Sequence, residues 1–315
     1  MRPIMICGAA ALLAGVSAAP LPHWRTGALA DRHTSSRFYF SGDGYLDISH
    51  GHFEERLAVR YRRPDGSYDP EAVAAVRRFF RARQDAPVGD VSLRLIELID
   101  FVQDRFRPTK MILISGYRSP EFNDDLRSNG ARAAKTSLHT EGGAADIRFV
   151  GLDSRRLWRM LRTLKTGGVG LYQQENFLHL DIGPPRFWEP QTSRVDENLS
   201  AGNARVFART DFDRYALLDG ALVQLYSVTE LPLRIGRHAR LGSQPVEIEP
   251  ADDTLALDED CWVIERAADA YRFRVKAGAG PLSTPRRLPL TLATCLPRIA
   301  ATPPEVQSNP IERLP

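Results

Sequence analysis

Three short segments of the 315-residue chain contain the residue types and spacings that metal chemistry requires. The central one has His139 followed by Asp146, and a later one has His179 followed by Asp181. Two imidazoles and a carboxylate form a common tetrahedral zinc set that leaves the fourth position for water. Zinc lowers the pKa of a bound water to about 7, so the pattern predicts hydrolytic chemistry at neutral pH.

The spacing within the central segment argues against one continuous helix. Gly142 and Gly143 lie between His139 and Asp146, and two adjacent glycines weaken a helix. Glycines also let the chain turn back closely, and the apolar residues after Asp146 are typical of a strand. We therefore expect a loop to carry His139 and a strand to carry Asp146.

The alternation over residues 177–182 predicts a second strand at the site. Side chains two residues apart on a strand share a face, so we expect His179 and Asp181 to lie side by side. The residues on the other face are apolar and should point into the core: Leu178, Leu180 and Ile182. His50 and His52 have the same spacing around a glycine, but a turn or surface role is the stronger interpretation there.

The remaining segment is Ser115-Gly116-Tyr117-Arg118-Ser119, at the end of a buried strand predicted over 111–114. With Ser-x-His-x-x-Gly-x-Ala-x-Asp at 137–146 and the later His-x-Asp, it resembles the zinc D-Ala-D-Ala carboxypeptidase family. Three further runs look like the periplasmic murein endopeptidase branch of that family: Gly167-Gly168-Val169-Gly170-Leu171-Tyr172, Phe177-Leu178-His179-Leu180-Asp181 and Arg186-Phe187-Trp188. The resemblance covers residues 38–190.

The resemblance implies an α+β fold with a central antiparallel sheet and flanking helices. The implied activity is zinc-dependent hydrolysis of amide bonds in peptidoglycan stem peptides or crosslinks. Carried over by position, one zinc ion would be bound by His139, Asp146 and His179. Arg118 would polarise the scissile carbonyl or hold a substrate carboxylate. Tyr117 and Ser137 would line the substrate site, and Ser137 has bracing of the ligand loop as its alternative role.

The general base implied by the resemblance is harder to place. Several relatives have an acidic residue three positions before the second ligand histidine, where this chain has Asn176, which cannot take a proton. Asp181 is the local substitute, and its competing role is to orient the imidazole of His179. Glu141 is a further candidate.

Two other functions stay open at this stage. One is a D,D- or L,D-carboxypeptidase or dipeptidase that trims the ends of stem peptides. The other is a non-catalytic murein-binding or cell-wall assembly protein, which the changed residue at position 176 keeps under consideration.

The first half of the chain has clear element signals. Residues 36–63 alternate around glycine-rich turns and predict short strands. Asp69 followed by Pro70 is a strong helix start, with aspartate as N-cap and proline in the first turn. Apolar spacing predicts further helices over about 92–106 and over 154–166, where Gly167 and Gly168 end the second one.

The first 18 residues have the layout of a secretory signal peptide. Arg2 precedes an apolar run from 4 to 16, and Val16-Ser17-Ala18 forms a small-residue cleavage pattern. The run is short for a membrane span, although an uncleaved anchor is the alternative. We expect export to the periplasm and no membrane span in the mature chain.

The composition and the hydrophobic pattern of the sequence change after residue 190. We expect an N-terminal segment over 19–37, a zinc peptidase-like catalytic domain over 38–190 and a polar linker over 191–203. Short strand-like runs then predict a smaller all-β domain of unknown role over 204–297. The proline-rich end, residues 298–315, has the composition of a disordered tail.

Charge and cysteine content set outer limits on function. The whole chain has 42 Lys+Arg against 39 Asp+Glu, which gives no electrostatic case for nucleic-acid binding. The partner that the family resemblance implies is peptidoglycan. Three cysteines are too few for a disulfide scaffold or a cysteine-rich zinc module. Cys7 lies in the signal peptide, so Cys261 and Cys295 remain, either as a disulfide or as two free thiols.

Overall fold

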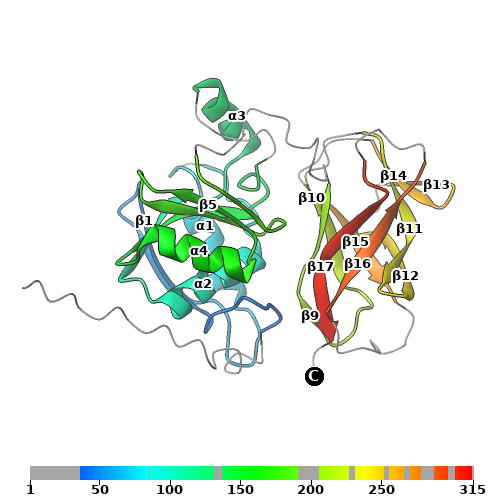
Figure 1. Ribbon diagram of the computed structural model, residues 1–315, viewed down its shortest axis with the longest axis horizontal. Helices are drawn as coiled ribbons and strands as arrows, with labels where there is room; N and C mark the ends of the chain where they lie inside the picture. Colours follow the sequence, from blue (N-terminus) through cyan, green and yellow to red (C-terminus); the bar gives the residue numbers. More distant parts are fainter. Residues whose placement is uncertain are drawn as a thin grey trace, which may run out of the picture.

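The computed structural model describes residues 36–84, 86–130, 137–190, 206–226, 231–251, 255–265, 270–277, 287–296 and 302–313. The expected signal peptide and linker therefore lie outside the described residues. The described chain forms two halves, each with its own sheet and its own buried apolar cluster (Figure 1). In these ranges no helix has both the length and the apolar character that a bilayer span needs.

The first half contains a seven-stranded sheet in the order β2-β1-β3-β4-β6-β5-β7. Its strands are β1 (Tyr45–His50), β2 (Arg56–Arg60), β3 (Lys110–Ser115), β4 (Ala144–Val150), β5 (Gly168–Tyr172), β6 (Phe177–Asp181) and β7 (Arg186–Trp188). Its helices are α1 (Pro70–Phe79), α2 (Leu93–Phe106), α3 (Pro120–Ser128) and α4 (Ser154–Leu164). Figure 1 shows α1, α2 and α4 against the sheet and α3 standing apart from it.

The α+β class is confirmed, but the sheet is mixed, where a central antiparallel sheet was expected. β1 pairs with β3 in parallel, and β5 pairs with β7 in parallel. The first parallel pair has a physical reason: α1 and α2 lie between β1 and β3 in the chain, and parallel neighbours need such a crossover. The strands that carry the candidate ligands, β4 and β6, pair antiparallel at the centre of the sheet.

Local signals placed the helices of the first half well. The Oδ1 atom of Asp69 accepts from the backbone N–H groups of Glu71 and Ala72, which caps α1 as the Asp-Pro sequence predicts. The buried face of α1 contains Val73, Val76 and Phe79. α2 begins one residue after the expected start, and α4 ends before its glycine pair.

The second half is a ten-stranded sheet whose main path runs β8-β10-β15-β12-β11-β16-β17-β9. Its strands are β8 (Phe207–Thr210), β9 (Arg214–Tyr215), β10 (Leu222–Tyr226), β11 (Leu233–Leu241), β12 (Gln244–Pro250), β13 (Ala256–Asp258), β14 (Cys261–Ile264), β15 (Ala270–Lys276), β16 (Leu288–Thr294) and β17 (Glu305–Arg313). A disulfide joins Cys261 to Cys295. Of the two alternatives for this cysteine pair, the structure contains the bonded one.

The expectation of a disordered tail over 298–315 is wrong for residues 305–313. This segment is β17, which pairs antiparallel with β16 and in parallel with β9. Val306 and Ile311 are buried in the apolar cluster of the second half. Burial of these side chains stabilises the strand despite its proline-rich surroundings.

The two halves contact each other through polar groups and through the rings of Phe38 and Phe212, whose centroids are 5.3 Å apart. The Arg94 guanidinium on α2 forms an ion pair with the buried carboxylate of Asp213 and donates to the carbonyl of Thr210 at 2.9 Å. The carbonyl of Arg37, ahead of β1, accepts from the N–H groups of Asp213 and Arg214 at 2.9 and 3.1 Å. The first described residues of the chain thus lie against the second sheet.

Candidate metal centre

β4 and β6 bring Asp146 and His179 directly opposite each other, as Cα partners in the antiparallel register. The next strand, β5, places Gly170 opposite His179 and Gly168 opposite Asp181. A Cβ atom at Gly168 would lie 2.2 Å from Oδ2 of Asp181, so glycine leaves the space that this carboxylate fills. Small residues on β5 therefore allow polar side chains of β6 to pack inside the sheet surface.

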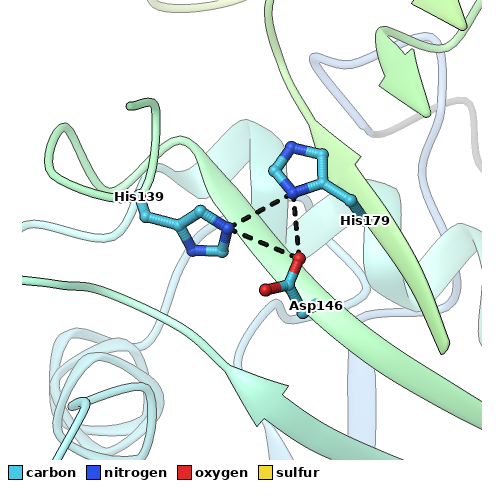
Figure 2. A group of neighbouring side chains, drawn as sticks. All are labelled: His139, Asp146 and His179. Carbon is cyan, nitrogen blue, oxygen red and sulfur yellow. Dashed lines mark hydrogen bonds and ion pairs between the residues drawn. The ribbon is translucent and has the colours of Figure 1, made fainter. Parts of the chain in front are cut away.

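His139 reaches the same point from the loop before β4. Figure 2 shows the two imidazoles and the carboxylate pointing toward one another. Nε2 of His139 lies 3.2 Å from Nδ1 of His179 and 3.4 Å from Oδ1 of Asp146. Nδ1 of His179 lies 2.9 Å from the same Oδ1. These three residues form a group whose ligand atoms converge as metal ligands do.

The loop that carries His139 is fixed by its own backbone. The N–H of Gly143 donates to the carbonyl of Leu138 at 2.8 Å, and Gly142 has φ +64°, a conformation that favours glycine. Nδ1 of His139 lies 2.7 Å from the carbonyl oxygen of Gly116. A carbonyl only accepts, so Nδ1 carries the proton and Nε2 keeps its lone pair toward Asp146 and His179.

Asp181 contacts the second imidazole on the side away from the other two candidate ligands. Oδ2 of Asp181 lies 3.0 Å from Nε2 of His179, the ring nitrogen that faces away from Asp146. Oδ1 of Asp181 accepts from the N–H groups of Gly168 and Gly183 at 3.1 and 2.8 Å. Both oxygens also face the guanidinium of Arg186, at 3.3 and 2.8 Å.

The electrostatics of the cluster keep both carboxylates ionised. Burial by itself would raise the pKa of Asp146, but the adjacent His139 and His179 lower it well below its usual range. Burial likewise opposes ionisation of Asp181, and the Arg186 charge with the bond from His179 lowers its pKa well below the usual range. Burial, with the charge of Arg118, lowers the pKa of His139 and keeps it neutral. Burial would lower the pKa of His179, but its bonds with Asp146 and Asp181 raise it and favour the protonated imidazole. Ionised carboxylate and neutral imidazole are the forms that bind a metal cation, so metal binding would release the proton from His179.

Arg118, predicted from sequence as a catalytic residue, lies at the cluster. Its Nη2 atom is 3.0 Å from Oδ2 of Asp146, and its Nε donates to Oγ of Ser115 at 2.9 Å. The guanidinium thus holds one oxygen of Asp146 while the other faces both histidines. The contact with substrate expected for Arg118 stays a prediction.

Ser137 and Tyr117 lie beside the cluster with other contacts. Oγ of the buried Ser137 accepts from the N–H of His139 at 3.3 Å, which favours the bracing alternative for this residue over substrate binding. The backbone N–H of Tyr117 donates to the carbonyl of Phe80, and the ring of Tyr117 lies against Gly89. The expected role of Tyr117 in substrate binding stays a prediction.

The other candidates from the sequence lie apart from the three ligands. Asn176 is in the turn between β5 and β6, where its Oδ1 accepts from Oγ of Ser154 at 2.8 Å. His50 stacks on Phe53 with ring centroids 4.0 Å apart, and Nε2 of His52 pairs with the carbonyl of Ile114. Both contacts explain the second histidine pair without a metal.

Three features of the site were not singled out as functional from the sequence. The Trp188 ring packs beside His179 with centroids 5.1 Å apart, and a Cβ atom at Gly170 would meet that indole at 2.5 Å. The carbonyl of Gly116 and the guanidinium of Arg186 orient His139 and Asp181. Arg186 and Trp188 belong to the Arg-Phe-Trp run, so the sequence could have indicated them as site residues. The carbonyl of Gly116 is a backbone group, which no residue type identifies.

The fold and the donor set together describe a candidate metal centre: two histidines and an aspartate converge on adjacent strands and one loop of a mixed sheet. The family model described as Peptidoglycan L,D-endopeptidase MepK matches residues 42–188, which contain all three ligand residues. The chain belongs to this family, and the resemblance expected from its motifs is confirmed.

Curated relatives support the assignment. The chain is 31% identical over 144 residues to Peptidoglycan L,D-endopeptidase MepK of Escherichia coli strain K12, which covers 45% of this chain and 79% of that protein. It is 29% identical over 137 residues to the probable peptidoglycan L,D-endopeptidase MepK of Haemophilus influenzae, over 43% of this chain and 73% of that protein. No solved structure matches the chain. The second sheet lies beyond the matched residues.

Proposed function

We propose that the chain is an exported zinc-dependent endopeptidase that hydrolyses L,D amide bonds in peptidoglycan. The observation that carries this proposal is the convergence of His139, Asp146 and His179 within a segment that matches peptidoglycan L,D-endopeptidases. The apolar, small-residue pattern of residues 1–18 supports export, and peptidoglycan lies outside the inner membrane.

The donor set fits one zinc ion. Nε2 of His139, Nδ1 of His179 and Oδ1 of Asp146 lie within 3.4 Å of one another, and both imidazoles have their other nitrogen bonded to an acceptor. Three protein ligands with oriented histidines are typical of catalytic zinc sites. A bound zinc would supply Lewis acidity and a water with a pKa of about 7.

The chain's own residues would divide the remaining work. Arg118 holds Oδ2 of Asp146, and its guanidinium is suited to a substrate carbonyl or carboxylate beside the metal. Asp181 is better suited to orientation than to proton transfer, because its oxygens already accept from His179, Gly168, Gly183 and Arg186. Glu141, two residues after His139, is then the next candidate for the general base.

Purified mature protein incubated with murein sacculi tests the proposal. We expect soluble muropeptides in the presence of zinc, none with chelator present, and none from His139→Ala with zinc added. Mass analysis should show crosslinked dimers converted to monomers. Loss of terminal residues alone would favour a carboxypeptidase, and sacculus binding without products would favour the non-catalytic function.

A further inference from the structure

Arg209 on β8 connects the second half of the chain to the loop that follows β6. Its Nη2 atom donates to the carbonyl oxygen of Gly183 at 2.9 Å. Gly183 belongs to the first half, two residues after Asp181. Figure 1 shows the edge of the second half that includes β10, the neighbour of β8, facing the first half.

The same glycine supports the carboxylate that orients the metal site. The N–H of Gly183 donates to Oδ1 of Asp181 at 2.8 Å, and Oδ2 of Asp181 lies 3.0 Å from Nε2 of His179. Arg209 therefore binds the carbonyl of Gly183, and the N–H of the same glycine binds Asp181. Three consecutive polar contacts connect the second sheet to a candidate metal ligand.

The strand that carries Arg209 is held against the first half. The Arg94 guanidinium on α2 binds the next residue of β8, donating to the carbonyl of Thr210 at 2.9 Å. Arg94 also pairs with the buried carboxylate of Asp213, so two links hold this edge against the first half. The Nε atom of Arg209 is buried without a hydrogen-bond partner among the described residues, so the contact from Nη2 to Gly183 is the polar contact that holds this guanidinium.

A glycine needs such a support more than other residues do. Gly183 lies in a tight space, because a Cβ atom there would meet Nη1 of Arg186 at 2.6 Å and Oδ1 of Asp181 at 2.9 Å. Without a side chain to anchor it, its backbone has more conformational freedom than that of other residues. Pro184 already restricts the backbone of Gly183, and the donor from Arg209 further restrains the carbonyl of the peptide group between these two residues.

We propose that Arg209 is a positioning residue for the metal centre: by holding Gly183 it fixes Asp181 and, through it, the direction of Nδ1 of His179. The second half is then a structural part of the site rather than an independent appendage. The inference rests on the proposed function only in that the three ligands bind a metal.

Metal affinity of the full mature chain is the direct test. The variants are Arg209→Ala, Arg209→Lys and the control Arg240→Ala, which removes an exposed arginine of the same sheet paired with Glu305. We expect Arg209→Ala to weaken zinc binding about 3-fold in chelator competition, less than the roughly 10-fold loss expected when a residue bonded directly to a ligand, such as Asp181, is removed. Arg209→Lys should recover part of the affinity, and Arg240→Ala should bind like the parent.

Cobalt substitution gives a readout that a purely structural role would not change. We expect the visible absorption bands of the cobalt form to shift in Arg209→Ala and to stay unchanged in Arg240→Ala. Thermal unfolding of the metal-free proteins measures any general destabilisation separately. If Arg209→Ala does not fold, Arg209→Lys and Arg209→Gln are compared with the parent in the same way.

A double-mutant cycle tests the route. In an Asp181→Asn background, Arg209→Ala should produce little further loss of zinc affinity, because the two residues act through one path. Zinc binding by Arg209→Ala equal to that of the control, or losses that add fully in the double variant, would overturn the inference. A parent protein that binds zinc but does not cleave sacculi would contradict the proposed function alone.

Discussion

The guanidinium of Arg118 lies 3.0 Å from one carboxylate oxygen of Asp146 and leaves the other oxygen facing both histidines. The arginine therefore selects which oxygen of Asp146 is presented to a metal. It also adds a positive charge beside the neutral His139.

Removing this support should weaken the metal site. We expect Arg118→Ala to reduce zinc affinity by about 10-fold or more, as loss of an outer-shell partner does. Arg118→Lys should recover only part of it, because an ammonium cannot reproduce the fork that spans Asp146 and Ser115. Isothermal titration with zinc measures both, and parental affinity in Arg118→Ala would contradict the assigned contact.

The two roles considered for Asp181 predict different kinetics. If Asp181 orients His179, Asp181→Asn should lose activity mainly through metal affinity, and added zinc should restore most of kcat. A general base would instead contribute about 10²–10⁴-fold to the chemical step at any zinc concentration. Activity measured against zinc concentration separates the two, and a kcat loss of that size at saturating zinc would return the base role to Asp181.

Gly168 should not tolerate a side chain. The Cβ atom of an alanine at this position would lie 2.2 Å from Oδ2 of Asp181. Gly168→Ala should therefore lower the free energy of unfolding by about 1–3 kcal/mol through overpacking. It should also weaken zinc binding. Gly236→Ala is the matched control, since the nearest atom there lies 3.5 Å away. Urea unfolding of both variants measures the effect, and equal stabilities would count against the packing described.

Because its pKa is raised in the folded state, Asp100 should make the free energy of unfolding fall as the pH rises. Burial raises the pKa of this carboxyl to about 8 despite a bond from the hydroxyl of Tyr61. In the unfolded chain it ionises near pH 4. The folded state therefore binds a proton that the unfolded state releases, so this contribution is complete below about pH 4 and is lost through about pH 8.

Asp100→Asn removes this titration and isolates it. Relative to the variant, the parent should lose about 1 kcal/mol or more between pH 5 and pH 8. Urea unfolding at several pH values measures the difference between the two proteins. A difference that stays constant over this range would show that the carboxyl does not titrate as described.

The disulfide should stabilise the second sheet. Cys261 and Cys295 are separated by 34 positions, and closing a loop of that length contributes about 4 kcal/mol in the chain-entropy picture. Cys295→Ser should lower the unfolding free energy of the second half by an amount of this order. The mature protein should show no titratable thiol before reduction, and two thiols would rule the bond out.

Local patterns were sufficient for much of the first half of the fold and for placing the candidate ligands on a loop and two strands. Asp69 and Pro70 specify a helix start by themselves, since the cap and the backbone angle need no distant partner. The alternation that placed His179 and Asp181 on one face is equally local. The glycines between His139 and Asp146 predicted a loop beside a strand for the same reason.

Nonlocal contacts account for what the sequence did not provide. β17 depends on pairing with β16 and on burial of Val306 and Ile311, which composition alone cannot express. The position of the Asp181 carboxylate depends on N–H groups from Gly168 and Gly183. Every residue except proline has a backbone N–H, so the sequence does not show which ones bind this carboxylate. Parallel pairing of β1 and β3 likewise depends on a crossover rather than on local alternation.

The contacts of Arg37 with Asp213 and Arg214 place a segment ahead of β1 beside β9 and the neighbouring end of β17. The carbonyl of Arg37 accepts from Asp213 and Arg214, and Glu312 near the C-terminus forms an ion pair with Arg214. The two halves are thus joined covalently through residues 191–205 and non-covalently through the contacts of Arg37, Arg94 and Arg209. A single backbone break within 191–205 would leave two fragments still associated, so proteolytic nicking there should not release the second half.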